Sequence, residues 1–225
     1  SMADETFAYR MASTLFPLAD SFGLNEQELA YIFESLGGRY RDYGTSAEAL
    51  TGKTPDVHAV TSALEFVLKR ADEWSLAAGG GDDDGGGAAA NSIRRISRVH
   101  FHCLSYHIIV ERDVPGRERW GEDLWRATAQ GAVAATNNAC GPATAASPLD
   151  ALKRLVQPEY FEESDLELLY DKPCRGERRN GVCYWSSENE GTAFSLAPVL
   201  VCAHPRNTVG LGDAISSTGL AYSLK

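Results

Sequence analysis

The sequence lacks three features that would place it at once in a common class of protein. No apolar run approaches the about 20 residues that a membrane-spanning helix needs, so no span is expected. Its 21 basic residues are outnumbered by 31 acidic ones, which gives a formal net charge of −10 and argues against nucleic acid or an anionic membrane surface as a partner. Its five cysteines contain no CxxC pair, so no zinc-binding signature is present.

The chain is large enough to fold around a core of its own. Its 225 residues are 44% hydrophobic, which fits one domain or most of one. Cys174 and Cys183 flank Asn180-Gly181, a strong hairpin-turn signal, so they could form a disulfide or remain separate buried thiols. Ser1-Met2 does not resemble a native start. We therefore expect the native amino terminus to be missing, and the compartment stays open between the cytoplasm and the lumen of the endoplasmic reticulum.

Helix-type and strand-type patterns alternate along the chain. Apolar residues at helical spacing predict helices at residues 5–17, 26–36, 56–73, 118–139 and 213–224. Residues rich in β-formers predict strands at 18–24, 182–186 and 192–202, and one or two strands within 97–110. We expect a loop at 39–55 and shorter helical pieces within 148–172. This alternation favours an α/β domain with a largely parallel sheet.

One segment has a composition that does not favour a packed structure. Residues 77–90 read AAGGGDDDGGGAAA and offer too little apolar surface to offset the entropy cost of ordering. We therefore expect a mobile insertion at about 77–92.

The stretch Thr208-Val-Gly-Leu-Gly-Asp213 combines the features of a phosphate site. It follows an apolar strand and a short turn, and it leads into a helix. Gly210 and Gly212 let backbone N–H groups approach an anion, and the helix N-terminus adds its positive dipole end. Such a loop suits phosphate oxygens and the charge that develops during phosphoryl transfer.

Asp213 lies where that anion would be held. A carboxylate beside a transferred phosphoryl group can accept the proton of the attacking hydroxyl. The alternative is that Gly-x-Gly-Asp only forms a tight strand-to-helix turn, with Asp213 as the N-cap.

Asn25-Glu-Gln-Glu28 lies at a second strand-to-helix junction. Because open α/β sheets bind ligands at the carboxyl ends of their strands, both motifs could converge on one edge. The carboxylate of Glu28 could hold Mg²⁺ directly or through water. The alternative is a helix start capped by Asn25, with acidic residues favoured by the helix dipole.

Three histidines lie close together in the strand-like segment 97–110. His100 and His102 would share one strand face, and His107 would point away if the strand stays regular. Packing, or stacking near an adenine, is favoured over a metal site.

These motifs together resemble a known family. PVLVCAHPRNTVGLGDAISSTGLAYS (198–223) is similar to the C-terminus of the eukaryotic ADP-dependent glucokinases, LFPLADSFGLNEQELAYI (15–32) resembles their NxxE region, and RVHFHCLSYHI (98–108) resembles their central histidine-containing strands. The three matches come in the family's order and span nearly the whole chain.

The resemblance implies a fold and a reaction. The fold would be a ribokinase-like three-layer sandwich with a central, mostly parallel sheet, and residues 1–225 would form its C-terminal part. The reaction would be transfer of the β-phosphoryl group of ADP to the 6-hydroxyl of glucose, which yields glucose 6-phosphate and AMP.

The resemblance also implies roles for individual residues. Asp213 would be the general base, Gly210, Leu211 and Gly212 would form the anion hole, and Glu28 with Asp213 would serve Mg²⁺. The residues implied near the nucleotide are Asn25, His102, Arg206, Thr208 and Val209.

The chain departs from the family in length. Family members are about twice as long, and the N-terminal half carries most of the sugar site, the lid, and an HxE-type motif whose Glu also serves Mg²⁺. We therefore expect this chain to be a monomer that is a poor or inactive kinase by itself. Two other functions remain open, namely an ATP-dependent ribokinase-type kinase for another sugar or a nucleoside, and a non-catalytic α/β module that binds nucleotide or a partner.

Overall fold

The computed structural model describes residues 2–79, 96–114, 124–140, 177–179, 182–187, 191–199 and 210–223. They fall into two compact units, residues 1–99 and 100–225, and each is described by itself. The low-complexity segment beyond Gly79, the segment 148–172 and the start of the helix expected at 118 lie outside the described residues.

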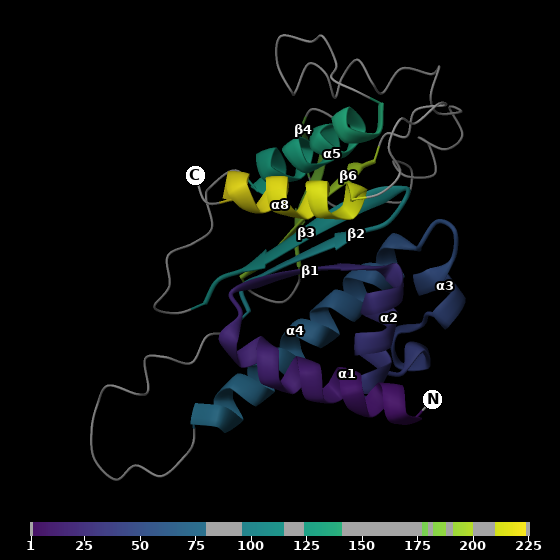
Figure 1. Cartoon of the computed structure of the whole chain (residues 1–225), viewed down its shortest axis with the longest axis vertical. Helices are drawn as coiled ribbons and strands as arrows, with labels where there is room; N and C mark the ends of the chain where they lie inside the picture. The colour runs from purple at the N-terminus through teal and green to yellow at the C-terminus, as the bar shows by residue number, and fades with distance from the viewer. Residues whose placement is uncertain are drawn as a thin grey trace, which may run out of the picture. The chain divides into compact units, whose positions relative to one another are not determined.

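The first unit is mostly helical (Figure 1). Its elements are α1 (Met2–Leu15), η1 (Phe16–Leu18), β1 (Ser21–Asn25), α2 (Glu26–Ser35), η2 (Tyr40–Tyr43), α3 (Ala47–Thr51) and α4 (Val57–Gly79). The helices expected at 5–17, 26–36 and 56–73 are thus present. The first begins earlier than expected, and the third continues six residues further, from residue 73 to Gly79.

Helix α2 packs against α1 and α4. Both α2 and α4 are amphipathic, and their apolar stripes face the core of this unit. The buried side chains of the two helices include Leu29, Ile32, Phe33, Val60, Leu64, Val67 and Leu68. This periodic burial is what the spacing of apolar residues predicted.

The loop expected at 39–55 is wrong in part, because this segment contains η2 and α3. Gly44, with φ +62°, ends η2 in a left-handed conformation that favours glycine. The Ser46 side chain then accepts a hydrogen bond from Ala49 N at 3.1 Å and caps α3. Elements of four and five residues are too short to show a periodic apolar pattern, so the sequence did not reveal them.

Strand β1 lies beside the chain that enters β2 (Arg98–His102). The backbone N–H groups of Ser97 and Arg98 both donate to the carbonyl oxygen of Asp20, at 3.0 and 3.3 Å. The buried guanidinium of Arg98 donates from Nη1 to Ser21 Oγ at 3.1 Å. These contacts hold the end of the first unit's chain against the start of β1.

The second unit contains a sheet covered by two helices. Its strands are hydrogen-bonded in the order β2-β3-β6-β5-β4, where β2 crosses the boundary between the units. The bounds are β3 (Tyr106–Arg112), β4 (Glu177–Arg179), β5 (Val182–Ser186) and β6 (Thr192–Pro198), and the helices are α5 (Leu124–Cys140) and α8 (Leu211–Ser223). The strand predicted at 182–186 is confirmed, because β5 has the same bounds.

The strand directions differ from the largely parallel sheet that the alternating pattern favoured. The described pairs β3–β6, β5–β6 and β4–β5 are all antiparallel. The chain between β4 and β5, and between β5 and β6, is too short for the crossover that parallel strands need. Asn180-Gly181 lies between β4 and β5, where its turn signal placed a hairpin.

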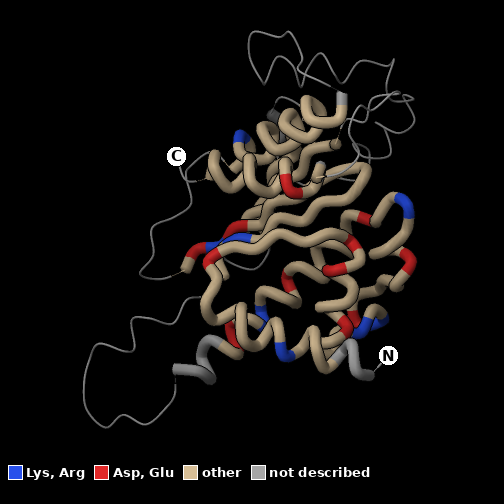
Figure 2. Tube along the Cα trace, viewed as in Figure 1, with Lys and Arg blue, Asp and Glu red and all other residues tan. Residues whose placement is uncertain are grey.

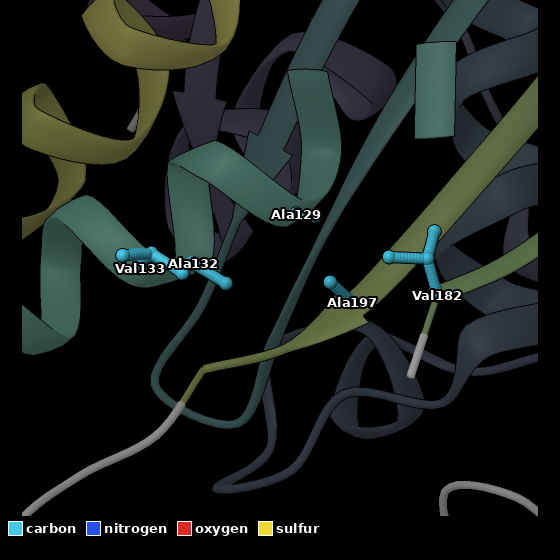
Figure 3. Packing of buried hydrophobic residues seen from close by; sticks show 5 residues of the cluster. All are labelled: Ala129, Ala132, Val133, Val182 and Ala197. Carbon is cyan, nitrogen blue, oxygen red and sulfur yellow. The ribbon is translucent and has the colours of Figure 1, made fainter. Parts of the chain in front are cut away.

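Helix α5 packs on β3, β5 and β6 and along α8. Figure 3 shows one buried cluster that joins Ala129, Ala132 and Val133 of α5 with Ala197 of β6 and Val182 of β5. All five residues are buried, and side chains as short as those of alanine and valine let a helix lie close to a sheet. No helix in the described part of the chain is both long and apolar enough to cross a bilayer.

Gly131 lies where α5 comes close to both β3 and α8. A Cβ placed on it would lie 3.0 Å from Cε1 of His107 in β3 and 3.1 Å from the backbone oxygen of Ile215 in α8. Both neighbours belong to the packed interior of this unit, and one is backbone, so neither can move freely. The absence of a side chain at residue 131 therefore sets how closely α5, α8 and β3 come together.

We predict that Gly131→Ala destabilises the chain although alanine is the better helix former. The helix propensity gain is about 1 kcal/mol, while overpacking in a well-packed interior costs about 1–3 kcal/mol. Urea unfolding followed by circular dichroism measures the difference. A clear gain in the free energy of unfolding would show that α8 is not held closely against α5.

Candidate functional site

Helix α8 begins two residues earlier than the sequence suggested. Its first residue is Leu211, and the backbone N–H of Ala214 donates to the carbonyl of Gly210 at 3.0 Å. Gly210 therefore occupies the N-cap and Asp213 the third helical position. The interpretation of Asp213 as an N-cap is wrong for this reason.

Gly210 supplies the conformation that turns the chain into α8. Its φ is +75°, in the left-handed region, and a Cβ there would meet nothing within 4 Å. The requirement for glycine thus comes from the backbone alone. The first amides of α8 have no acceptor within the helix, so residues 211–213 present N–H groups to whatever lies at this end.

Asp213 is exposed and lies in the first turn of α8. Figure 2 shows an acidic segment near the start of this helix. The Ser217 hydroxyl donates to the backbone carbonyl oxygen of Asp213 at 2.6 Å, a contact that does not involve the carboxylate. Backbone donors and an exposed carboxylate therefore occur within one helical turn.

Gly212 is in direct contact with the ring of His102. A Cβ on Gly212 would lie 2.2 Å from Nε2 of His102 and 2.7 Å from its Cδ2, which no real contact allows. The second glycine of the motif is therefore favoured by packing, a reason that does not depend on any bound anion. His102 of β2, a candidate nucleotide neighbour, is brought beside the candidate anion hole.

The other two histidines form a buried pair. His100 Nε2 and His107 Nδ1 are 2.8 Å apart, and both side chains are fully buried. His107 was expected to point away from His100 only if one regular strand held both. The segment instead forms two neighbouring strands, β2 and β3, whose pairing brings the two rings together. Both rings lie in the packed interior of the second unit, and the described residues contain no group of three or more His, Cys, Asp or Glu that could hold a metal ion.

Asn25 and Glu28 form the capping box of α2 in the first unit. Asn25 Oδ1 accepts from the N–H groups of Gln27 and Glu28, each at 2.9 Å, and Glu28 Oε2 accepts from Asn25 N at 2.8 Å. The predicted N-cap and helix start are confirmed. Glu28 is exposed, so its Oε1 can face a ligand while Oε2 serves the cap.

Some of the predicted site residues lie in parts of the chain that the structure does not describe. Arg206, Thr208 and Val209 fall outside the described residues. Cys183 is disulfide-bonded, and Cys174, the partner that the hairpin signal suggested, lies outside the described residues. Sequence reasoning missed Gly131, whose only signal was a single glycine inside an alanine-rich helix.

Comparison with known sequences identifies relatives along nearly the whole chain. The family described as "ADP-specific Phosphofructokinase/Glucokinase conserved region" matches residues 1–222. The chain is 34% identical over 225 residues to "Probable ADP-dependent glucokinase" of Caenorhabditis elegans, covering 99% of this chain and 40% of the relative. It is 35% identical over 214 residues to the ADP-dependent glucokinase of Bos taurus, covering 93% and 36%. The chain thus spans about two fifths of these relatives' length.

Solved structures show the same fold. A phosphofructokinase from Pyrococcus horikoshii with AMP superposes with a TM-score of 0.55 at 19% identity, covering 99% of this chain and 40% of that one. An ADP-dependent kinase in complex with fructose-6-phosphate and ADPβS gives 0.54 at 19% identity, covering 100% and 43%. These likenesses confirm the predicted α/β, ribokinase-like fold and show that the chain is part of it.

We predict that Gly212→Ala and His102→Ala are strongly coupled. The methyl group of Gly212→Ala would collide with the His102 ring, so either the ring or the start of α8 must move. We expect this to lower the free energy of unfolding by about 1–3 kcal/mol. In a His102→Ala background the same change should cost much less, because the clash is gone. A double-mutant cycle on the free energy of unfolding measures this coupling. Additive effects would place the His102 ring away from Gly212.

Proposed function

This chain belongs to the ADP-specific phosphofructokinase/glucokinase family, and we propose that it carries the general base and the phosphate-binding turn of a kinase that uses ADP to phosphorylate glucose. The observation that supports this most is the first turn of α8, where Gly210 and Gly212 expose backbone amides beside the carboxylate of Asp213. The names of the two animal relatives favour glucose as the acceptor.

In the proposed reaction the chain's own residues move one proton and stabilise one charge. The 6-hydroxyl of glucose gives its proton to the carboxylate of Asp213. The hydroxyl oxygen bonds to the β-phosphorus of ADP as the bond from that phosphorus to the AMP oxygen breaks, giving glucose 6-phosphate and AMP. The amides of residues 211–213 and the positive end of the α8 dipole face the phosphoryl oxygens, whose charge is largest at that point.

The oxygen ligands needed for Mg²⁺ are available in the proposed site. Mg²⁺ binds carboxylate oxygens and keeps several waters, and the exposed carboxylate of Glu28 has Oε1 outside the capping box. Glu28, held in position by Asn25, is proposed as a ligand of the ion, and Asp213 is proposed as a ligand only because the chain belongs to this family. Bound Mg²⁺ would neutralise charge on the nucleotide phosphates.

His102 is proposed to lie near the nucleotide. Its ring contacts Gly212, so it borders the turn that would hold the phosphates. Turnover by the chain alone is expected to be weak, because it spans about two fifths of its relatives' length and a kinase site also needs the sugar-binding part.

We predict that this chain binds ADP and AMP at least about tenfold more tightly than ATP, a difference of about 1.4 kcal/mol. Calorimetric titration with each nucleotide in the presence of Mg²⁺ measures this. Gly212→Val should weaken all three, and Asp213→Asn should leave AMP binding nearly unchanged because the carboxylate acts on the acceptor. Tighter binding of ATP would favour an ATP-dependent ribokinase-type kinase, and a folded chain that binds no nucleotide would contradict the proposed site.

We predict that Glu28→Gln removes the Mg²⁺ dependence of ADP affinity without unfolding α2. A glutamine at this position still accepts the hydrogen bond from Asn25 N, as in other capping boxes, but it lacks the charge that binds the ion. Glu26→Gln is the matched control, since it removes an acidic residue from the same first turn and loses the same dipole interaction. ADP titrations with and without Mg²⁺ measure this dependence. The same Mg²⁺ dependence of ADP affinity in Glu28→Gln and Glu26→Gln would exclude Glu28 from the metal site.

A further inference from the structure

Two of the five histidines form a buried contact that the proposed reaction does not use. His100 Nε2 of β2 and His107 Nδ1 of β3 are 2.8 Å apart, and the two ring centroids are 5.0 Å apart. Both side chains are 0% exposed. We call these two residues the histidine pair. Both strands carry the pair within the second unit.

The contact between the two rings limits how many protons the pair can hold. A hydrogen bond between two nitrogens needs an N–H on one ring and a lone pair on the other. In the neutral pair, one ring donates and the other accepts. One extra proton can enter at the outer nitrogen of the donating ring, which leaves the contact intact. The next proton must go to the accepting nitrogen, and the contact then breaks because both facing nitrogens carry protons.

The unfolded chain has no such limit. There each histidine takes up a proton of its own near about pH 6.5. Below that pH the unfolded state therefore binds at least one proton more than the intact pair. By linkage, the stability that the pair contributes is fully present above about pH 6.5 and is lost as the pH falls. Burial acts in the same direction, because the outer nitrogens His100 Nδ1 and His107 Nε2 are buried and a charge there loses its hydration.

The neighbouring elements also carry charged and titratable groups. On β2, Arg98 and His102 share the strand face of His100, and the buried cation of Arg98 opposes a further positive charge beside it. The other such groups in the described residues are Glu111, which shares the strand face of His107 on β3, Arg126 on α5, and Asp213 and Tyr222 on α8, while the described strand β6 carries none. The limit of one extra proton does not depend on these charges, because it comes from the accepting nitrogen.

The histidine pair is packed against both helices of the second unit. A Cβ on Gly131 of α5 would lie 3.0 Å from Cε1 of His107 and 3.1 Å from the backbone oxygen of Ile215 in α8. Ile215 is buried and lies in the second turn of α8, two residues after Asp213. Because so little space remains at Gly131, the His107 ring cannot move toward α5 without displacing α8. Breaking the pair therefore acts on the first two turns of α8 (Figure 1).

We propose that the histidine pair is an acid-sensitive device that holds α8 against α5 and β3 at neutral pH and releases it in weak acid. The proposal rests on the contact between the two rings and on their packing at Gly131, and not on the proposed phosphoryl transfer.

The test is urea unfolding of the full chain at two pH values. In the double variant His100→Gln with His107→Asn, the side-chain amides take the places of Nε2 and Nδ1 and keep a hydrogen bond that does not titrate. From about pH 7.5 to about pH 5.5, the unfolding constant of the wild type should rise at least about tenfold more than that of the double variant, which corresponds to one proton. His58→Gln, which removes an exposed histidine of the first unit, should keep the wild-type dependence. An equal rise in the wild type and the double variant would overturn the proposal.

A second measurement uses the wild-type chain alone, in case the double variant does not fold. Nitrogen resonances of the histidine rings are followed as the pH is lowered over the same range. One of the two facing nitrogens should keep the resonance of an unprotonated nitrogen for as long as the chain is folded. Conversion of both rings to imidazolium in a chain whose other resonances stay unchanged would overturn the proposal.

Hydrogen exchange tests the effect on α8. After correction for the intrinsic pH dependence of exchange, the backbone amides from Ala214 to Gly219 should exchange faster in weak acid in the wild type and not in the double variant. Equal protection of these amides at both pH values would show that the pair does not hold α8.

These outcomes are separate from those that test the proposed function, because no nucleotide is present. At about pH 7.5 the double variant should bind ADP as the wild-type chain does, since its amide hydrogen bond still holds α8. A wild-type chain that binds no nucleotide at this pH but shows the expected dependence of stability on pH would contradict the kinase proposal and support the histidine pair. Normal ADP binding without that dependence would do the reverse.

Discussion

The position of helix α8 depends on two glycines that face histidine rings. Gly212 at its first turn lies against His102, and Gly131 of α5 lies between His107 and the backbone of Ile215. At each point a single methyl group would meet an atom at 3.0 Å or less. The end of α8 that carries Asp213 is therefore fixed by the packing of α5, β2 and β3. The residues that would bind phosphate and the residues that pack the second unit are in part the same.

The same combination of structural and chemical roles occurs in the first unit. Asn25 and Glu28 satisfy three backbone N–H groups at the start of α2, and a capping box of this kind is common in proteins that bind no ligand. The cap does not exclude a metal role, because it uses one carboxylate oxygen of Glu28 and fixes the direction of the other. A capped carboxylate is held in place before the ion arrives, which lowers the entropy cost of binding it.

Much of this arrangement could be predicted from the sequence, where a local rule applied. The cap at Asn25 and the helix that follows it depend on neighbouring residues only, and the local signal Asn180-Gly181 predicted the antiparallel pairing of β4 with β5. The contact of His100 with His107, and the packing at Gly131, depend on the register between strands and on the approach of one helix to another, and no local pattern encodes these. The parallel strands were expected because strands and helices alternate, but the connections between β4, β5 and β6 are too short for crossovers.

The proposed kinase function depends most on the first turn of α8, which would bind the phosphates of the nucleotide. The most direct measurement is the change in backbone amide resonances of the isotope-labelled chain as ADP with Mg²⁺ is added. The largest shifts are expected at Gly210, Leu211, Gly212 and Asp213, with a smaller Mg²⁺-dependent shift at Glu28. Saturable shifts that leave the start of α8 unchanged would contradict the account, because ADP would then bind elsewhere.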